Sequence, residues 1–160
     1  QVELGELANE WRGFKFWSEY REPREIVPIA NCRACSGTGL GGDTGRFDCQ
    51  NCNGEGVLYG YPLLEEYVDC LHFILSIGLD KKYTNVDLVE IPRTEDITYQ
   101  FLNMFRAINR FVDVECISYY RDMISVFIKL GEQLGFTWEQ IEQAYFEKNE
   151  INHKRQEEGY

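Results

Sequence analysis

The chain has 160 residues, with 27 Asp and Glu against 16 Lys and Arg and a net charge of −11. This length suffices for one sizeable core, and the acidic balance argues against a broad nucleic-acid-binding surface, because phosphate contacts need clustered Lys and Arg. No hydrophobic run is long enough to span a bilayer and the start is unlike a signal peptide, so we expect a cytoplasmic protein that binds neither membranes nor nucleic acid.

The first stretch with helical character runs from Val2 to about Tyr20, where prolines begin to interrupt it. It opens with Glu3 and Glu6, which lie on one face of a helix because they are three residues apart. Since this pair stands so close to the beginning of the sequence, we expect a further helix before it in the full-length protein.

Residues 32–56 differ from the rest of the chain, because they are rich in Gly and Cys and poor in apolar residues. CRACSGTG and CQNCNGEG are two copies of a Cys-x-x-Cys-x-Gly-x-Gly unit. The spacing lets both sulfurs of each pair reach one tetrahedral Zn²⁺, and the glycines permit the tight turns that this requires. We therefore predict a structural zinc finger in a reducing compartment, with a redox dithiol pair as the alternative. The predicted ligands are Cys32, Cys35, Cys49 and Cys52.

This eight-residue unit resembles the zinc-binding repeats of the DnaJ chaperone family, which carries four of them where this chain has two. The resemblance implies zinc ligation, and we do not extend it to chaperone activity.

Residues 64–79, LEEYVDCLHFILSIGL, are too apolar for a solvent-exposed helix and too few for a membrane span. The pattern predicts a core helix with Glu66 and Asp69 on one edge. Charges on such a helix need partners, and a hard divalent cation is a natural one. If this helix packs against the first, Glu3 and Glu6 would complete a set of four carboxylates around Mg²⁺. The alternative is an edge of ordinary surface acids.

After a polar connection over residues 80–96, the sequence pattern of the remaining chain predicts three more helices. Apolar positions recur at helical spacing beyond Thr98, with a break near residues 112–115. Thr137 and Gln140 then form a capping box at the start of the last helix. So much apolar surface on so few helices favours a homodimer, with a larger monomeric bundle as the alternative.

Lys148, Asn152 and Arg155 lie along one stripe of this last helix, a pattern that a plain solvated face would also give. The segment that contains them, EKNEINHKRQEEGY, closely resembles the C-terminal motif of the dimeric dUTPases. These enzymes belong to the all-α nucleoside triphosphate pyrophosphatases, which include MazG-like proteins. ELGELANE, FKFWS and EEYVDCLHFILSIGL extend the resemblance over most of the chain except the finger and the middle connection.

The resemblance implies an all-α helical bundle over residues 1–27 and 61–160, into which the zinc finger of residues 28–60 is inserted. It also implies catalytic Mg²⁺ bound by the two acid pairs. The substrate contacts that it implies are Lys148, Asn152, Arg155 and Tyr160, with Asn9 in the first motif. Lys15 and Trp17 lie beside each other near the predicted metal site, where they are candidates to contact phosphate and base; the alternative is that the aromatic residues pack in the core.

The implied reaction is Mg²⁺-dependent hydrolysis of dUTP, and of dUDP, to dUMP with release of pyrophosphate or phosphate. Two departures stand out: the zinc insertion between the acid motifs, and the missing leading helix that supplies part of the uracil pocket in the family. The alternatives are a related pyrophosphatase for dCTP or another nucleotide, and a zinc-stapled interaction module on an enzyme scaffold. In either case the finger offers a surface for a protein partner.

Overall fold

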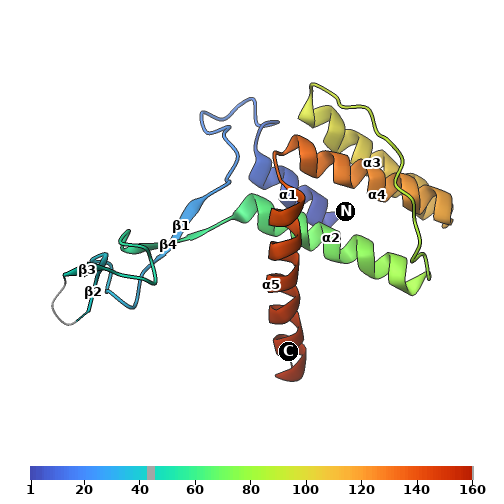
Figure 1. Ribbon diagram of the computed structural model, residues 1–160. Coiled ribbons are helices and arrows are strands. Elements are labelled where there is room, and N and C mark those ends of the chain that lie inside the picture. The colour runs from blue at the N-terminus through green and yellow to red at the C-terminus, as the bar shows by residue number, and fades with distance from the viewer. Residues whose placement is uncertain (43–45, 160) are drawn as a thin grey trace. The chain divides into compact units, whose positions relative to one another are not determined.

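The computed structural model describes residues 1–42 and 46–159, and the chain divides into two compact units. One unit comprises Gln1–Pro23 and Leu63–Tyr160, and the other comprises Arg24–Pro62. The first is built from helices, whereas the second holds short strands (Figure 1). Four clustered cysteines also lie in the second unit. The predicted class, an all-α bundle with a small inserted unit, is therefore confirmed.

The helical unit contains five helices among the described residues, and α3 and α4 form a hairpin whose two helices lie side by side (Figure 1). None of the described helices is both long enough and apolar enough to cross a membrane. The helices are α1 (Val2–Trp11), α2 (Pro62–Asp80), α3 (Ile97–Asp113), α4 (Ile117–Gln133) and α5 (Trp138–Glu157).

The starts of the later helices follow from their caps. Asp96 accepts a hydrogen bond from the Thr98 amide at 2.8 Å and begins α3. The predicted capping box at the start of α5 is present, because Thr137 and Gln140 each accept a hydrogen bond from the other's backbone amide.

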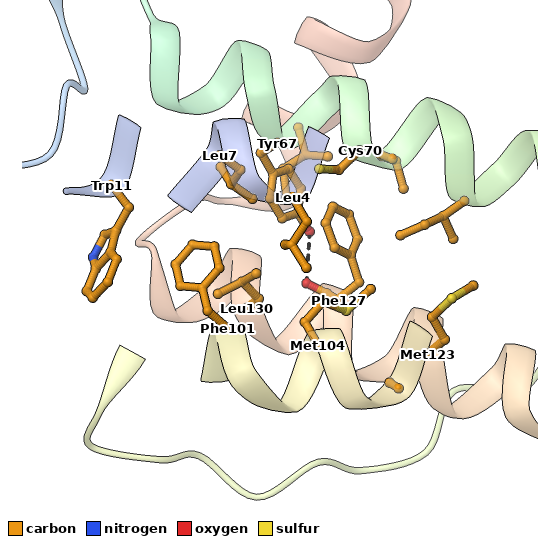
Figure 2. Close-up of a cluster of buried hydrophobic side chains, with 14 of the residues drawn as sticks. Leu4, Leu7, Trp11, Tyr67, Cys70, Phe101, Met104, Met123, Phe127 and Leu130 are labelled. Atoms are coloured by element: carbon orange, nitrogen blue, oxygen red, sulfur yellow. Dashed lines mark hydrogen bonds between the residues drawn. The ribbon is translucent and has the colours of Figure 1, made fainter. Parts of the chain in front are cut away.

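Residues from all five helices contribute to one buried hydrophobic core, part of which Figure 2 shows. Two of its buried polar side chains donate hydrogen bonds to backbone carbonyls of α4. Tyr67 of α2 stacks on Phe127 of α4 with ring centroids 4.4 Å apart, and its hydroxyl donates to the Phe127 carbonyl at 3.3 Å. Gln100 of α3, which is fully buried, donates to the Val126 carbonyl at 3.1 Å. These bonds fix the helices in register, since an unpaired polar group in this core would be costly.

The first helix ends earlier than predicted, at Trp11 rather than near Tyr20. Arg12 adopts a left-handed conformation with φ 64° and its amide closes the helix on the Ala8 carbonyl. The segment after it is a series of turns, held in part by a hydrogen bond from the Arg12 side chain to the Tyr20 carbonyl at 2.9 Å. The apolar residues of this segment, which suggested a continued helix, are aromatic side chains that contact one another across the turns.

The second unit consists of two antiparallel strand pairs and two cysteine turns. Strand β1 (Val27–Asn31) pairs with β4 (Val57–Gly60), and β2 (Leu40–Gly41) pairs with β3 (Phe47–Asp48). Gly39 and Gly56 both have positive φ, and a Cβ on either would run into a backbone carbonyl of the other cysteine turn. The repeated glycines are therefore needed for the two turns to approach each other.

The buried contact between α4 and Tyr67 gives a prediction on stability. A Cβ at Gly131 would overlap the Tyr67 hydroxyl, which is held in the core. We expect Gly131→Ala to lower the free energy of unfolding by about 1–3 kcal/mol, although Ala is the better helix former. The matched control is Gly5→Ala in α1, where a Cβ meets nothing within 4 Å and should stabilise by about 0.5–1 kcal/mol. Equal changes in the urea midpoint for both variants would contradict this account of the core.

Candidate active site and zinc site

Three acidic side chains from α1 and α2 converge. The carboxylates of Glu3, Glu6 and Glu66 each offer an oxygen, and these oxygens all lie within 4.8 Å of one another. Helical spacing places Glu3 and Glu6 on one face of α1, and the packing of Leu4 and Leu7 into the core turns that helix toward α2. Three of the four predicted acids, Glu3, Glu6 and Glu66, therefore lie close together in the structure.

The electrostatics of this acidic trio, Glu3, Glu6 and Glu66, are unfavourable without a cation. Burial and the neighbouring Glu6, Asp69 and Glu3 raise the pKa of Glu66 to about 7. Burial and nearby acids also raise the pKa of Glu3. One carboxylate oxygen of Glu66, Oε2, is buried without a hydrogen-bond partner among the described residues. Carboxylate oxygens lie close together here, and one carboxylate oxygen is buried without a hydrogen-bond donor among the described residues. These are features of a binding site for a hard cation.

Asp69, the fourth predicted acid, lies outside the group of mutually close oxygens and forms an ion pair with Lys148 of α5. The Lys148 Nζ donates to Asp69 Oδ2 at 2.7 Å, and both side chains are partly buried. Asp69 is still close enough to the acidic trio to raise the pKa of Glu3 and of Glu66. The structure thus brings a predicted phosphate-binding lysine directly to the acidic centre.

The other predicted substrate residues near the first helix lie in α1 and the turns after it. Lys15 Nζ donates a hydrogen bond to Asn9 Oδ1, which ties the turns back to the last part of α1. Trp17 is 66% exposed and makes edge contacts with Phe14 and Phe16. Its ring is therefore held in place by two aromatic neighbours while much of its surface stays open to a ligand.

The remaining predicted residues continue along α5 beyond the ion pair. Asn152 is partly buried, and Arg155 is exposed on the last turns of the helix. Tyr160 lies outside the described residues.

One acid of the site was missed by sequence reasoning. Glu10 contributes to the raised pKa of Glu66, so it lies near the acidic trio. It stands four residues after Glu6 on α1, and this spacing was the available signal.

A cavity of about 320 Å³ opens elsewhere on the helical unit, between α3, α4 and the connection that precedes α3. None of its lining residues is a predicted site residue. The lining includes Ile91, Asn103, Arg106, Arg110, Tyr119 and Asp122.

The four predicted zinc ligands form a compact buried cluster in the second unit. All four sulfurs lie within 4.8 Å of one another, with Cys32 and Cys49 3.9 Å apart and Cys35 and Cys52 3.7 Å apart. Sulfurs bound about 2.3 Å from one tetrahedral Zn²⁺ are separated by about 3.8 Å, so the cluster fits that ion. All six cysteines of the chain are free.

Polar groups around the cluster favour thiolates, although burial outweighs them at Cys52 and raises the pKa of that thiol to about 11. The Gly39 amide donates to Cys35 Sγ at 3.3 Å and the Gly56 amide to Cys52 Sγ at 3.2 Å. Asn51 donates to Cys32 Sγ at 3.2 Å and lowers the pKa of that thiol to about 6. These donors stabilise the charge that a metal-bound sulfur carries.

The sequence model of the dUTPase family matches residues 1–29 and 61–160. The chain belongs to the all-α dUTPase family. Comparison with curated proteins and with solved structures gives no match. This dUTPase is a dUTP diphosphatase, and the matched residues include both helices of the acidic trio and the whole of α5. All four clustered cysteines fall between the two matched segments, so the cysteine cluster is an addition to the family pattern in this dUTPase.

The raised pKa of Glu66 gives a pH prediction for this dUTPase in Mg²⁺-free buffer. Between about pH 4.5 and 7 the folded protein keeps a proton on Glu66 that the unfolded chain has lost, so stability should fall as the pH rises through this window. Glu66→Gln should flatten that fall, whereas Glu142→Gln on the exposed face of α5 should not. Urea midpoints measured across this range check it, and a parallel fall in the parent and Glu66→Gln proteins would contradict the account.

Proposed function

We propose that this dUTPase hydrolyses dUTP, and also dUDP, to dUMP in a Mg²⁺-dependent reaction that releases pyrophosphate or phosphate. The observation that carries the proposal is the convergence of Glu3, Glu6 and Glu66 from two helices to within 4.8 Å. The buried Oε2 of Glu66 supports the assignment, since none of the residues that the structure describes donates a hydrogen bond to it.

In this proposal Glu3, Glu6, Glu66 and Asp69 are the ligands that hold Mg²⁺. Bound there, Mg²⁺ would neutralise the triphosphate and supply an activated water. The raised pKa values of Glu3 and Glu66 support this role, because a nearby cation would favour the charged carboxylates that burial, and then repulsion among the acids, disfavour. Carboxylates that repel one another in the free protein are thereby stabilised in the loaded one.

The substrate contacts proposed for the chain come from both ends of the helical unit. Lys148 and Arg155 would hold phosphate oxygens through charge-assisted hydrogen bonds, with Asn152 between them on the same stripe. The position of Lys148 beside Asp69 supports its assignment. Trp17 offers an exposed ring to the base or sugar, and the bond between Lys15 and Asn9 orients the segment that carries it.

A homodimer is part of the proposal. Apolar side chains remain at least half exposed on helices whose other faces are buried, which supports a further apolar contact. Examples are Val112 at the end of α3, Phe73 of α2 and Phe146 of α5.

Substitution of one acid tests the catalytic proposal. We expect Glu66→Gln to lower the rate of Mg²⁺-dependent pyrophosphate release from dUTP by more than about 100-fold, because loss of a supporting group alone costs about 10–100-fold at metal sites. Glu142→Gln serves as the control with the same chemical change. The assay includes dUDP and dCTP, which separates the deoxyuridine assignment from the related pyrophosphatases. A parent protein that leaves every deoxynucleotide intact with Mg²⁺ present would rule the proposal out.

We further propose that Cys32, Cys35, Cys49 and Cys52 bind one structural Zn²⁺. A closed set of four thiolates has no open coordination position, so its role is to fold a unit whose described core consists of the cysteines themselves. Exposed Ile29 and Phe47 on this unit support the further proposal that it contacts a protein partner.

The zinc proposal predicts a difference between cysteines. Cys49→Ser should reduce bound zinc well below one ion per chain and expose the second unit to proteolysis, because zinc binding supplies most of its folding free energy. Cys116→Ser should keep the metal, since Cys116 lies at the start of α4 and outside the cluster. Metal analysis with limited proteolysis measures both effects, and zinc retained at full stoichiometry in Cys49→Ser would exclude this ligand set.

A further inference from the structure

We infer that Tyr145 and His72, whose rings stack between α5 and α2, are positioning residues that keep the substrate-binding stripe of α5 beside the acidic trio. The inference rests on the proposed function, because that proposal assigns the stripe to the nucleotide. Neither residue touches the substrate in this account, and neither is among the predicted site residues.

The stripe is a single face of α5. Ile141, Tyr145, Lys148, Asn152 and Arg155 follow one another at intervals of four, three, four and three residues. Ile141 is the one buried residue among the described residues of α5, and it lies in the first turns. Apolar burial therefore fixes where α5 starts, but not the direction in which its second half points.

Two side-chain contacts with α2 set that direction. The ring centroids of Tyr145 and His72 are 4.1 Å apart with an interplanar angle of 15°, and Lys148 pairs with Asp69 one turn further along. The two partners on each helix are three residues apart, so the contacts lie side by side along both helices. Together the ring stack and the ion pair hold the middle of α5 against α2, the helix that carries Glu66.

The His72 ring is held by its own helix. Its Nδ1 lies 2.9 Å from the Val68 carbonyl one turn earlier, which restrains the ring about its side-chain torsions. The Nε2 edge is buried as well. The ring thus presents a fixed flat face, against which the Tyr145 ring packs in parallel.

Substrate binding affects the ion pair between Lys148 and Asp69 but not the stack between Tyr145 and His72. The proposed function gives Asp69 to the metal and Lys148 to the phosphates, so their ion pair opens when both ligands bind. The stack between Tyr145 and His72 involves no group assigned to a ligand, so it persists. The stack then helps to keep Lys148 within reach of phosphates at the acidic trio, together with the packing of Ile141 and Tyr145 against the core.

The test measures nucleotide affinity in variants that remove or keep the ring. We expect Tyr145→Leu to weaken binding of a non-hydrolysable dUTP analogue, measured by calorimetry with Mg²⁺, by at least 10-fold, and to raise the KM for dUTP more than it lowers kcat. Tyr145→Phe keeps the stack and should behave as the parent. His72→Leu should match Tyr145→Leu, and the double variant should be no worse than either, because both changes remove the same contact.

Two controls separate positioning from loss of structure. Trp138→Leu removes an exposed aromatic ring from the start of the same helix and should leave analogue affinity unchanged. Binding of Mg²⁺ alone should be equal in Tyr145→Leu and the parent, since the acidic trio lies on α1 and α2. A folded Tyr145→Leu protein with parental analogue affinity would overturn the inference and leave the proposed function intact. A parent protein that binds no deoxyuridine nucleotide would overturn the proposed function and the inference with it.

Discussion

The acidic site depends on a hydrophobic core that holds carboxylates together against their mutual repulsion. Glu3, Glu6 and Glu66 are held within 4.8 Å of one another by two helices whose apolar faces are committed to the same core. The core does not let these helices separate to relieve the repulsion. Burial first, and the neighbouring acids second, therefore raise the pKa of Glu66. Burial of Leu4 and Leu7 is thus what maintains a charge arrangement that the acids alone would disfavour.

The same constraint explains the position of Lys148. An ammonium group beside Asp69 offsets part of the negative charge that accumulates where α1 and α2 meet. It does so from a helix that has little apolar burial of its own. In the free protein this lysine compensates the acids, and in the proposed function the same ammonium group would contact a phosphate of the nucleotide.

Much of this could be predicted from local patterns, and the failures have a common cause. The apolar periodicity of residues 64–79, the capping box at Thr137 and the doubled cysteine unit each depend on residues close in sequence, and each is present in the structure. The end of α1 was placed too late, because the left-handed turn at Arg12 has no strong sequence signal in a non-glycine residue. The pair of Asp69 with Lys148 and the stack of His72 on Tyr145 join residues more than 70 positions apart, and only the packed helices reveal them.

Strand pairing explains how the second unit can be inserted between the two acid helices. Val27 of β1 lies opposite Gly60 of β4, so the antiparallel pair brings the beginning and the end of the insertion together. Because its two ends are adjacent, the insertion connects its flanking segments over a distance that a short loop would also span. The entropy cost of bringing these ends together is offset by contacts within the inserted unit. The two clusters also suit different ions, because clustered thiolates favour a soft or borderline ion such as Zn²⁺ and clustered carboxylates favour a hard one such as Mg²⁺. The chain can therefore carry this insertion between α1 and α2, since the pairing of β1 with β4 brings the ends of the insertion together and the acidic trio is drawn from the two helices alone.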